Sequence, residues 1–467
     1  MDFDLSKIKN VHFVGIGGIG ISAIARMMLA EGKVVTGQDM QDSEIIHDLE
    51  KAGAKIIVGQ SIENIPSDTE LVVYTIAIEY YDPELFKKLK EGNVPVRSYP
   101  EMLGIVSAGK YTIAISGTHG KTTTTGMIAQ ILMDNKKNPS VIIGSLLQVN
   151  VKQKEENLSL VGAPGERVKS EDFALSAKQS RTNFICGKSE YFVVEACEYR
   201  RSFLQVNPKV LVITNIDADH LDYYKDIEDI KSAFRELATA VPADGFVVCN
   251  VNDKNIKDVV EGINAKVVDY QEFFDENLKL KIPGIHNKKN AAAARAVGSI
   301  IPIESSEVDS ALLNFPGTWR RFEFKGKLVS GTKVYDDYAH HPAEITACLQ
   351  GFRELYKKED GWKITIVFQS HLFSRTKALL PEFASCFTDA DKVLVLPIYF
   401  AREVDDGTIT PQILADKILE NGVDALAFSD FKLAEEFVKN LNLGEKDILV
   451  TLGAGQAYEV GDFILSL

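Results

Sequence analysis

The residues best suited to chemistry in this 467-residue chain form the string SGTHGKTT at positions 116–123. An apolar run before it predicts a strand, and the pattern after it predicts a helix. Glycine amides at a helix start bind phosphate, a lysine adds a point charge, and a threonine hydroxyl suits Mg²⁺. The spacing is shorter than in the usual phosphate loop, because Ile115 stands where the first glycine would be. We therefore predict an ATP site at Gly117, Thr118, His119, Gly120, Lys121, Thr122 and Thr123.

A second glycine-rich string, GIGGIG at 15–20, follows a predicted strand and opens a helical pattern. Glycines let the backbone turn tightly and bring amides close to a diphosphate at a helix N-terminus. Asp39 ends the next predicted strand, near the offset of about 20 residues expected for a ribose-binding acid. Two interpretations stay open: a dinucleotide-type diphosphate site, or a tight turn that needs glycine for packing only. The glycines concerned are Gly15, Gly17, Gly18 and Gly20.

Acidic residues and a histidine follow two further predicted strands. They are Glu195, Glu198, Asp219, His220 and Asp222. The carboxyl ends of parallel strands face the ligand crevice of such a sheet. Carboxylates suit Mg²⁺, and a neutral imidazole can share the ion. The alternative is that both aspartates cap a helix and His220 is an ordinary loop residue, but the phosphate loop upstream favours a metal site.

Four more strings combine histidines, arginines and acids in predicted loops. They are GIHNKKN at 284–290, WRRFE at 319–323, DDYAHHP at 336–342 and FQSHLFSRT at 368–376. Each is weak alone, and the pair of histidines before Pro342 is equally typical of a helix start. Six of the eight histidines nevertheless fall in the loops described so far, which favours chemistry over core packing.

Strand and helix patterns alternate along the chain and must position these loops. Continuous apolar runs are typical of strands buried on both faces of a parallel sheet, and the alternation predicts an α/β fold. The length favours about three domains, which we expect at 1–107, 108–316 and 317–467. The polar segment 148–183 is longer than an ordinary connection, and we interpret it as an excursion or mobile loop.

Composition narrows the function classes. Hydrophobic residues make up 45% and charged residues 25%, which is typical of a globular protein. The net charge of −14 argues against nucleic acid or an anionic membrane as the main partner. No apolar run approaches the roughly 18 residues of a membrane span, and the scattered cysteines are typical of a reducing cytosol.

Taken together, these strings resemble, in order and over nearly the whole chain, the motifs of the Mur ligases of bacterial cell-wall synthesis. The quoted matches are GTHGKTTTT, VVEACEYRRSFL, TNIDADHLDYY, GIHNKKN, GTWRRFE, DDYAHHP and SHLFSRT. The resemblance implies an N-terminal Rossmann-like domain for a UDP-sugar, a central P-loop domain for ATP and a C-terminal Rossmann-like domain for an amino acid. It implies a cytoplasmic monomer or homodimer that joins L-alanine to the lactyl carboxylate of UDP-N-acetylmuramate through an acyl phosphate, using ATP and Mg²⁺.

The resemblance also assigns roles to matching residues. Around the sugar nucleotide it places the four glycines together with Asp39, Thr75 and Ala77. Beyond the phosphate loop it assigns ATP to His286, Asn287, Asn290, Arg321 and Asp337, and Mg²⁺ to Thr122, Glu195 and His220. Lys121 would stabilise the transferring phosphoryl group. Amino-acid recognition would fall to Tyr338, His340, His371 and Arg375, since a cation pairs with a carboxylate and a histidine can take the proton of an amine.

Two alternative functions remain. A related recycling ligase would add a preformed peptide to the same UDP-sugar, although the SHLFSRT match favours single L-alanine. A nicotinamide-dependent dehydrogenase would explain the GIGGIG string and Asp39 but would leave the phosphate loop without a role.

Overall fold

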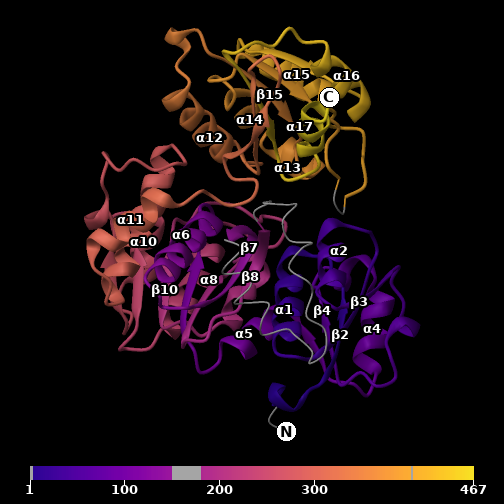
Figure 1. Cartoon of the computed structure of the whole chain (residues 1–467), viewed down its shortest axis with the longest axis vertical. Coiled ribbons are helices and arrows are strands. Elements are labelled where there is room, and N and C mark those ends of the chain that lie inside the picture. Colours follow the sequence, from indigo (N-terminus) through magenta and orange to yellow (C-terminus); the bar gives the residue numbers. More distant parts are fainter. Residues whose placement is uncertain (1–3, 150–179, 401–402) are drawn as a thin grey trace, which may run out of the picture. The chain divides into compact units, whose positions relative to one another are not determined.

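The structure, a computed structural model, describes residues 4–149, 180–400 and 403–467. The chain divides into two compact units, Met1–Phe274 with Lys289–Phe315, and Asp275–Lys288 with Pro316–Leu467. Three sheets, each flanked by helices, follow one another along the sequence (Figure 1). The predicted α/β class and its three-domain architecture are confirmed. In the described part of the chain, no helix has the length and apolarity needed to cross a membrane.

The first sheet is wholly parallel, in the order β3-β2-β1-β4-β5. Its strands are β1 (Asn10–Val14), β2 (Val34–Asp39), β3 (Lys55–Val58), β4 (Leu71–Tyr74) and β5 (Val96–Ser98). Its helices are α1 (Ile19–Ala30), α2 (Glu44–Lys51), α3 (Ile78–Tyr81), α4 (Pro83–Glu91) and α5 (Tyr99–Ser107). The central strands β1 and β4 are almost completely buried, which explains their continuous apolar runs.

The second sheet, in the same unit, has the order β12-β11-β10-β6-β9-β7-β8, and only the β7–β8 pair is antiparallel. The strands are β6 (Tyr111–Ser116), β7 (Ser140–Val149), β8 (Ser180–Ile185), β9 (Tyr191–Glu195), β10 (Val210–Ile213), β11 (Phe246–Cys249) and β12 (Lys266–Asp269). The helices are α6 (Lys121–Asp134), α8 (Ile227–Ala240), α9 (Lys254–Val260), α10 (Ile285–Ile300) and α11 (Ser305–Asn314), and the 3-10 segment η3 covers Tyr199–Gln205. Helix α10 begins in one compact unit and ends in the other.

The third sheet belongs to the second unit and has the order β13-β14-β18-β15-β16-β17, with only β13 antiparallel. Its strands are β13 (Glu323–Lys327), β14 (Lys333–Asp337), β15 (Lys363–Phe368), β16 (Lys392–Val395), β17 (Asp424–Ala427) and β18 (Asp447–Leu452). Its helices are α12 (Pro342–Leu355), α13 (Phe373–Ala378), α14 (Leu380–Ser385), α15 (Pro411–Glu420), α16 (Phe431–Lys439) and α17 (Tyr458–Leu465).

The prediction for the polar segment 148–183 needs correction at both ends. Its first two residues end β7 and its last four begin β8, and these strands pair antiparallel. Asn183, 1% exposed, donates from its side-chain amide to Ile19 O and Ser22 Oγ (2.8 Å) of helix α1. These ends are therefore structural, and residues 150–179 lie outside the described part of the chain.

Candidate active site

The phosphate-loop string joins strand β6 to helix α6, as the sequence predicts. Gly117 and Gly120 have φ of +130° and +81°, a region that favours glycine. A Cβ at Gly117 would overlap Thr214 Oγ1, and one at Gly120 would overlap Asn290 Oδ1. Both glycines are therefore required by backbone conformation and by close neighbours.

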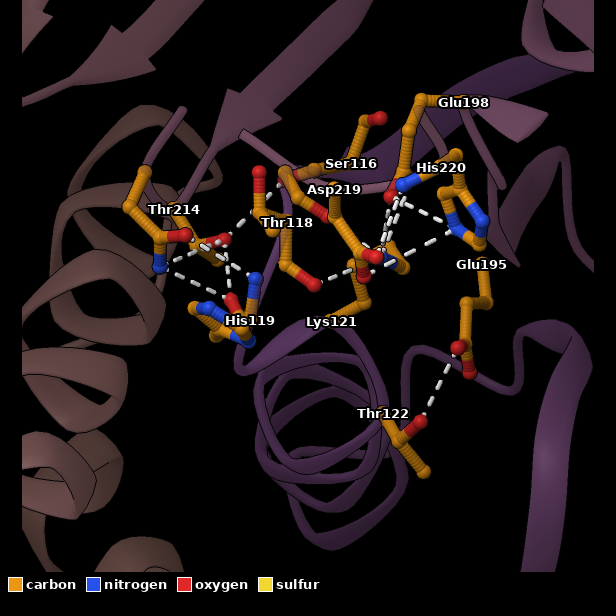
Figure 2. A network of polar contacts seen from close by, with 12 residues as sticks. Ser116, Thr118, His119, Lys121, Thr122, Glu195, Glu198, Thr214, Asp219 and His220 are labelled. Carbon is orange, nitrogen blue, oxygen red and sulfur yellow. Dashed lines mark hydrogen bonds and ion pairs between the residues drawn. The ribbon is translucent and has the colours of Figure 1, made fainter. Parts of the chain in front are cut away.

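Lys121 lies at the start of helix α6, and its ammonium is held by the loop itself and by one carboxylate (Figure 2). Nζ donates to Gly117 O and to Thr118 O (3.0 Å), and lies 3.0 Å from Glu198 Oε2. Burial favours the neutral amine, but the Glu198 carboxylate outweighs it, and the pKa of Lys121 is raised. The lysine is thus a fixed cation at the N-terminus of a helix, where anions bind.

Glu198 belongs to the site, although the sequence motifs did not predict a role for it. Its side chain is almost completely buried, and its main-chain oxygen accepts from the hydroxyl of Tyr224. The available signal was the repeat of acids at Glu195 and Glu198 after one strand. That signal could not say which acid would reach Lys121, because the pair spans 77 residues of sequence.

Glu195, the first acid of this repeat, contacts Thr122 in the first turn of helix α6. Thr122 Oγ1 donates to Glu195 Oε1 (2.9 Å), and the amide of Gly144 donates to Oε2 (2.8 Å). A hydroxyl and a carboxylate fit Mg²⁺, which needs only one or two protein oxygens besides substrate phosphates and water. The described residues contain no cluster of three or more His, Cys, Asp or Glu side chains that could hold a metal, so the ligand set stays a prediction.

His220 follows strand β10 in a left-handed conformation, with φ of +54°. Its Nε2 lies 3.6 Å from Glu198 Oε1 and 4.0 Å from Asp219 Oδ2, and its ring is 4.8 Å from that of Tyr199. The alternative that Asp219 caps locally has support, since Oδ1 accepts from the amide of His220 (2.7 Å). The histidine therefore borders the Lys121–Glu198 pair.

The residues that follow strand β10 also fix the phosphate loop. Thr214 Oγ1 and the Asn215 amide both donate to His119 O, at 2.5 and 2.9 Å, and Asn215 Oδ1 accepts from the amide of His119 (2.9 Å). The Thr118 hydroxyl accepts from the amide of Asp217 (2.8 Å). These bonds hold the loop in one conformation before any ligand arrives.

The N-terminal glycine turn is closed by its own acid. Gly17 N–H donates to Asp39 Oδ2 (2.8 Å), and Gly15, with φ of +78°, packs so tightly that a Cβ would overlap Thr75. A Cβ at Gly20 would lie 2.7 Å from the ring of Tyr99. The packing interpretation therefore has support from these contacts, and the diphosphate interpretation stays a prediction.

In the second unit, the two arginines of the WRRFE string have different roles. Arg320 is buried and bonds Asp336 (2.8 Å) and the carbonyls of Gly455 (2.9 Å) and Gly453 (2.6 Å). Burial raises the pKa of Asp336, although Arg320 opposes this. Arg321, the predicted ATP contact, lies with its guanidinium 5.2 Å from the Tyr338 ring.

Asp337, also predicted to bind ATP, has local partners. Its carboxylate accepts from the amides of Phe322 (2.7 Å) and Ala339 (2.8 Å), and burial raises its pKa while Arg321 opposes this. His341 accepts from the amide of Ala343 (3.3 Å) as the cap of α12. The helix-start interpretation of this string therefore holds for His341.

The predicted amino-acid residues of this unit do come together. The His340 ring lies 5.9 Å from that of His371 and 5.4 Å from that of Tyr338. Burial, with the nearby positive charge of Arg375, lowers the pKa of His340 to about 4, although Glu344 opposes it. His340 Nδ1 is 3.1 Å from Tyr338 O, which favours a proton on Nδ1 and a free lone pair on Nε2.

The remaining predicted residues lie on or beside helix α10. Asn290 is the neighbour of Gly120 in the first unit. Asn287 bonds Pro283 O (2.7 Å), and the His286 ring packs against Gly284, both in the second unit.

Known protein families match the chain in three consecutive parts. Family profiles described as "Mur ligase family, catalytic domain", "Mur ligase middle domain" and "Mur ligase, glutamate ligase domain" match residues 10–111, 115–275 and 320–455. The UDP-N-acetylmuramate–L-alanine ligases of Clostridium kluyveri and Caldanaerobacter subterraneus are 38% and 39% identical to the chain. The first alignment covers all of both proteins, and the second covers all of this chain and 99% of the relative.

Solved structures agree with these matches. The UDP-N-acetylmuramate–alanine ligase of Thermotoga maritima superposes with a TM-score of 0.75 at 26% identity, over 98% of each chain. A murein peptide ligase from Psychrobacter arcticus shares the fold, with a TM-score of 0.69 at 22% identity over 98% of each chain. Since the profiles cover most of its length in the expected order, the chain belongs to the Mur ligase family.

Proposed function

We propose that the chain is an ATP-dependent ligase that joins L-alanine to the lactyl carboxylate of UDP-N-acetylmuramate in peptidoglycan precursor synthesis. The observation that carries this is the phosphate loop with Lys121 fixed by Glu198, in a chain that aligns end to end with ligases of that name. ATP and a sugar nucleotide as substrates favour a cytoplasmic location. We propose the domain boundaries 107/108 and 316/317 for the three parts.

The chemistry proceeds in two steps. A lactyl carboxylate oxygen attacks the γ-phosphorus of ATP, the bond to the bridging oxygen breaks, and ADP leaves with an acyl phosphate formed. The amine of L-alanine then attacks the acyl carbon, loses a proton, and expels inorganic phosphate as the amide forms. Lys121 balances charge on the transferring group from its fixed position.

Other residues have supporting roles in this proposal. Thr122, Glu195 and His220 would hold a divalent cation that neutralises phosphate charge when bound. Asn290, His286, Asn287, Arg321 and Asp337 would bind the rest of ATP. His340 is suited to take the amine's proton through Nε2, because its low pKa keeps the ring neutral at pH 7. Arg375 would pair with the alanine carboxylate.

The test supplies UDP-N-acetylmuramate, ATP and Mg²⁺ with single amino acids or peptides, and follows ADP and amide together. We expect both products with L-alanine, and neither from a Lys121→Ala variant that is shown to be folded. Turnover only with a preformed peptide would identify the recycling ligase, and nicotinamide reduction without ADP would identify a dehydrogenase.

A further inference from the structure

Arg200 is a sequence neighbour of the candidate active-site residue Glu198 but has none of the roles assigned so far. It follows Glu198 by two residues, and Tyr199 between them packs on the ring of His220. Arg200 and Arg201 both have left-handed backbone, with φ of +54° and +55°, which non-glycine residues rarely adopt. Strain of this kind at an active site is a reason to look for a function.

Three tyrosine rings lie around the Arg200 guanidinium. Its carbon lies 3.7 Å from the ring centre of Tyr80, 5.5 Å from that of Tyr199 and 5.4 Å from that of Tyr223. Stacking holds a guanidinium by its faces and leaves its edge, with five N–H donors, open to an oxyanion. The arginine is therefore positioned without using its hydrogen-bonding capacity.

The donors of Arg200 have no acceptor among the described residues. Its Nε is buried there without a hydrogen-bond partner, and no carboxylate of those residues pairs with it. Arg201 differs, since it bonds Asp229 (2.7 Å) and Glu236 (3.2 Å). Arg200 and Arg201 thus share a backbone conformation, but of the two only Arg201 has its charge balanced by carboxylates of the described residues.

The surroundings of Arg200 indicate which anion it meets. Tyr80 lies on helix α3, directly after the turn 75–77, and Thr75 of that turn packs against Gly15. On its other side, Arg200 follows the segment that carries Glu195 and Glu198. Arg200 thus contacts the helix that follows the predicted sugar-nucleotide turn, and it lies two residues along the chain from Glu198, which pairs with Lys121 of the phosphate loop.

We propose that Arg200 binds the sugar nucleotide, offering its guanidinium edge to an oxyanion of that substrate, which is the diphosphate or the lactyl carboxylate. This inference rests on the proposed function. The tyrosines keep the edge oriented, and donors that have no acceptor in the described part of the chain gain one from this substrate.

The experiment measures KM for each substrate in Arg200→Gln, Arg200→Lys and Tyr80→Leu, with Arg201→Gln as the matched control. In Arg200→Gln we expect the KM for UDP-N-acetylmuramate to rise about 10- to 100-fold, as for loss of a charged hydrogen bond. The KM values for ATP and L-alanine stay within about twofold. Arg200→Lys keeps the positive charge but not the planar guanidinium edge. This variant and Tyr80→Leu should give intermediate increases in the KM for UDP-N-acetylmuramate.

Inhibition by UDP, which has the diphosphate but no lactyl group, separates the two oxyanions. Weaker inhibition of Arg200→Gln identifies the diphosphate, and unchanged inhibition identifies the carboxylate. An unchanged sugar-nucleotide KM in Arg200→Gln and Arg200→Lys, or an equal rise for ATP, overturns the inference. Calorimetry measures the binding of UDP-N-acetylmuramate to the wild type and to Arg200→Gln without turnover. It tests the role of Arg200 even if no ligation is seen, so this inference and the proposed function can fail separately.

Discussion

The Lys121–Glu198 pair gives the sharpest test of the site, through the substitution Glu198→Gln. The Glu198 side chain is 3% exposed and the Lys121 side chain 14% exposed, so neither charge is well solvated. Glutamine keeps the shape and one acceptor but removes the negative charge. The variant therefore leaves a nearly buried ammonium without a counter-charge, bonded to the carbonyls of Gly117 and Thr118 and facing a neutral amide.

The expected magnitude follows from these contacts. Removing one partner of a buried ion pair costs about 3–5 kcal/mol. Because two carbonyls and the new amide still accept from Lys121, we expect roughly half of this, about 2 kcal/mol. At about 2–4 °C per kcal/mol for a domain of this size, the melting temperature falls by roughly 4–8 °C.

Thermal unfolding with and without ATP measures this effect. Bound phosphate would return an anion to Lys121, so ATP should raise the melting temperature more in Glu198→Gln than in the wild type. Glu236→Gln is the control, since Glu236 pairs with Arg201 at 3.2 Å but is 62% exposed. An exposed pair contributes less than about 1 kcal/mol.

Two results would refute this reasoning. One is a melting temperature of Glu198→Gln equal to that of the control variant. The other is an ATP-induced shift no larger than in the wild type, since it would mean that phosphate does not meet Lys121.

Three other predictions concern the metal, the pH dependence and the second unit. Thr122→Val should raise the Mg²⁺ concentration for half-maximal turnover by about tenfold, because it removes the hydroxyl beside Glu195, and a magnesium titration measures this. Burial lowers the pKa of His12 to about 4 in the folded protein, whereas the pKa of an unfolded histidine is about 6.5. As the pH falls, the unfolded chain therefore takes up this proton before the folded chain does, and the folded state loses stability. Unfolding in urea should therefore show His12 contributing a loss of about 2 kcal/mol between pH 7 and pH 5, which His12→Gln abolishes. Arg320→Gln should destabilise the second unit by about 3–5 kcal/mol, seen as early proteolysis, because Asp336 loses its buried partner.

Each of these has a contrary outcome. A magnesium requirement unchanged in Thr122→Val would remove that hydroxyl from the metal site. The same pH slope in His12→Gln as in the wild type would mean that the buried imidazole does not titrate as stated. Proteolysis of Arg320→Gln at the wild-type rate would show that the bonds of Arg320 contribute little to the stability of the second unit.

Local sequence was sufficient for the elements and for the phosphate loop. The continuous apolar runs of β6 and β10 follow from burial on both sheet faces, and glycines 117 and 120 mark turns that other residues rarely make. The order of the motifs likewise predicted the three α/β domains. In the segment 148–183, polarity concealed the strand ends, because an edge strand need not be apolar.

The pairing of side chains was decided by tertiary structure alone. Sequence singled out Arg321, yet Arg320 is the buried arginine, and only the fold shows which one meets Asp336. Glu198 and Lys121, 77 residues apart, meet because β6 and β9 are neighbours in one sheet. Periodicity and turn chemistry are local and can be read from the sequence, whereas ion pairs and stacked arginines depend on strand order and packing.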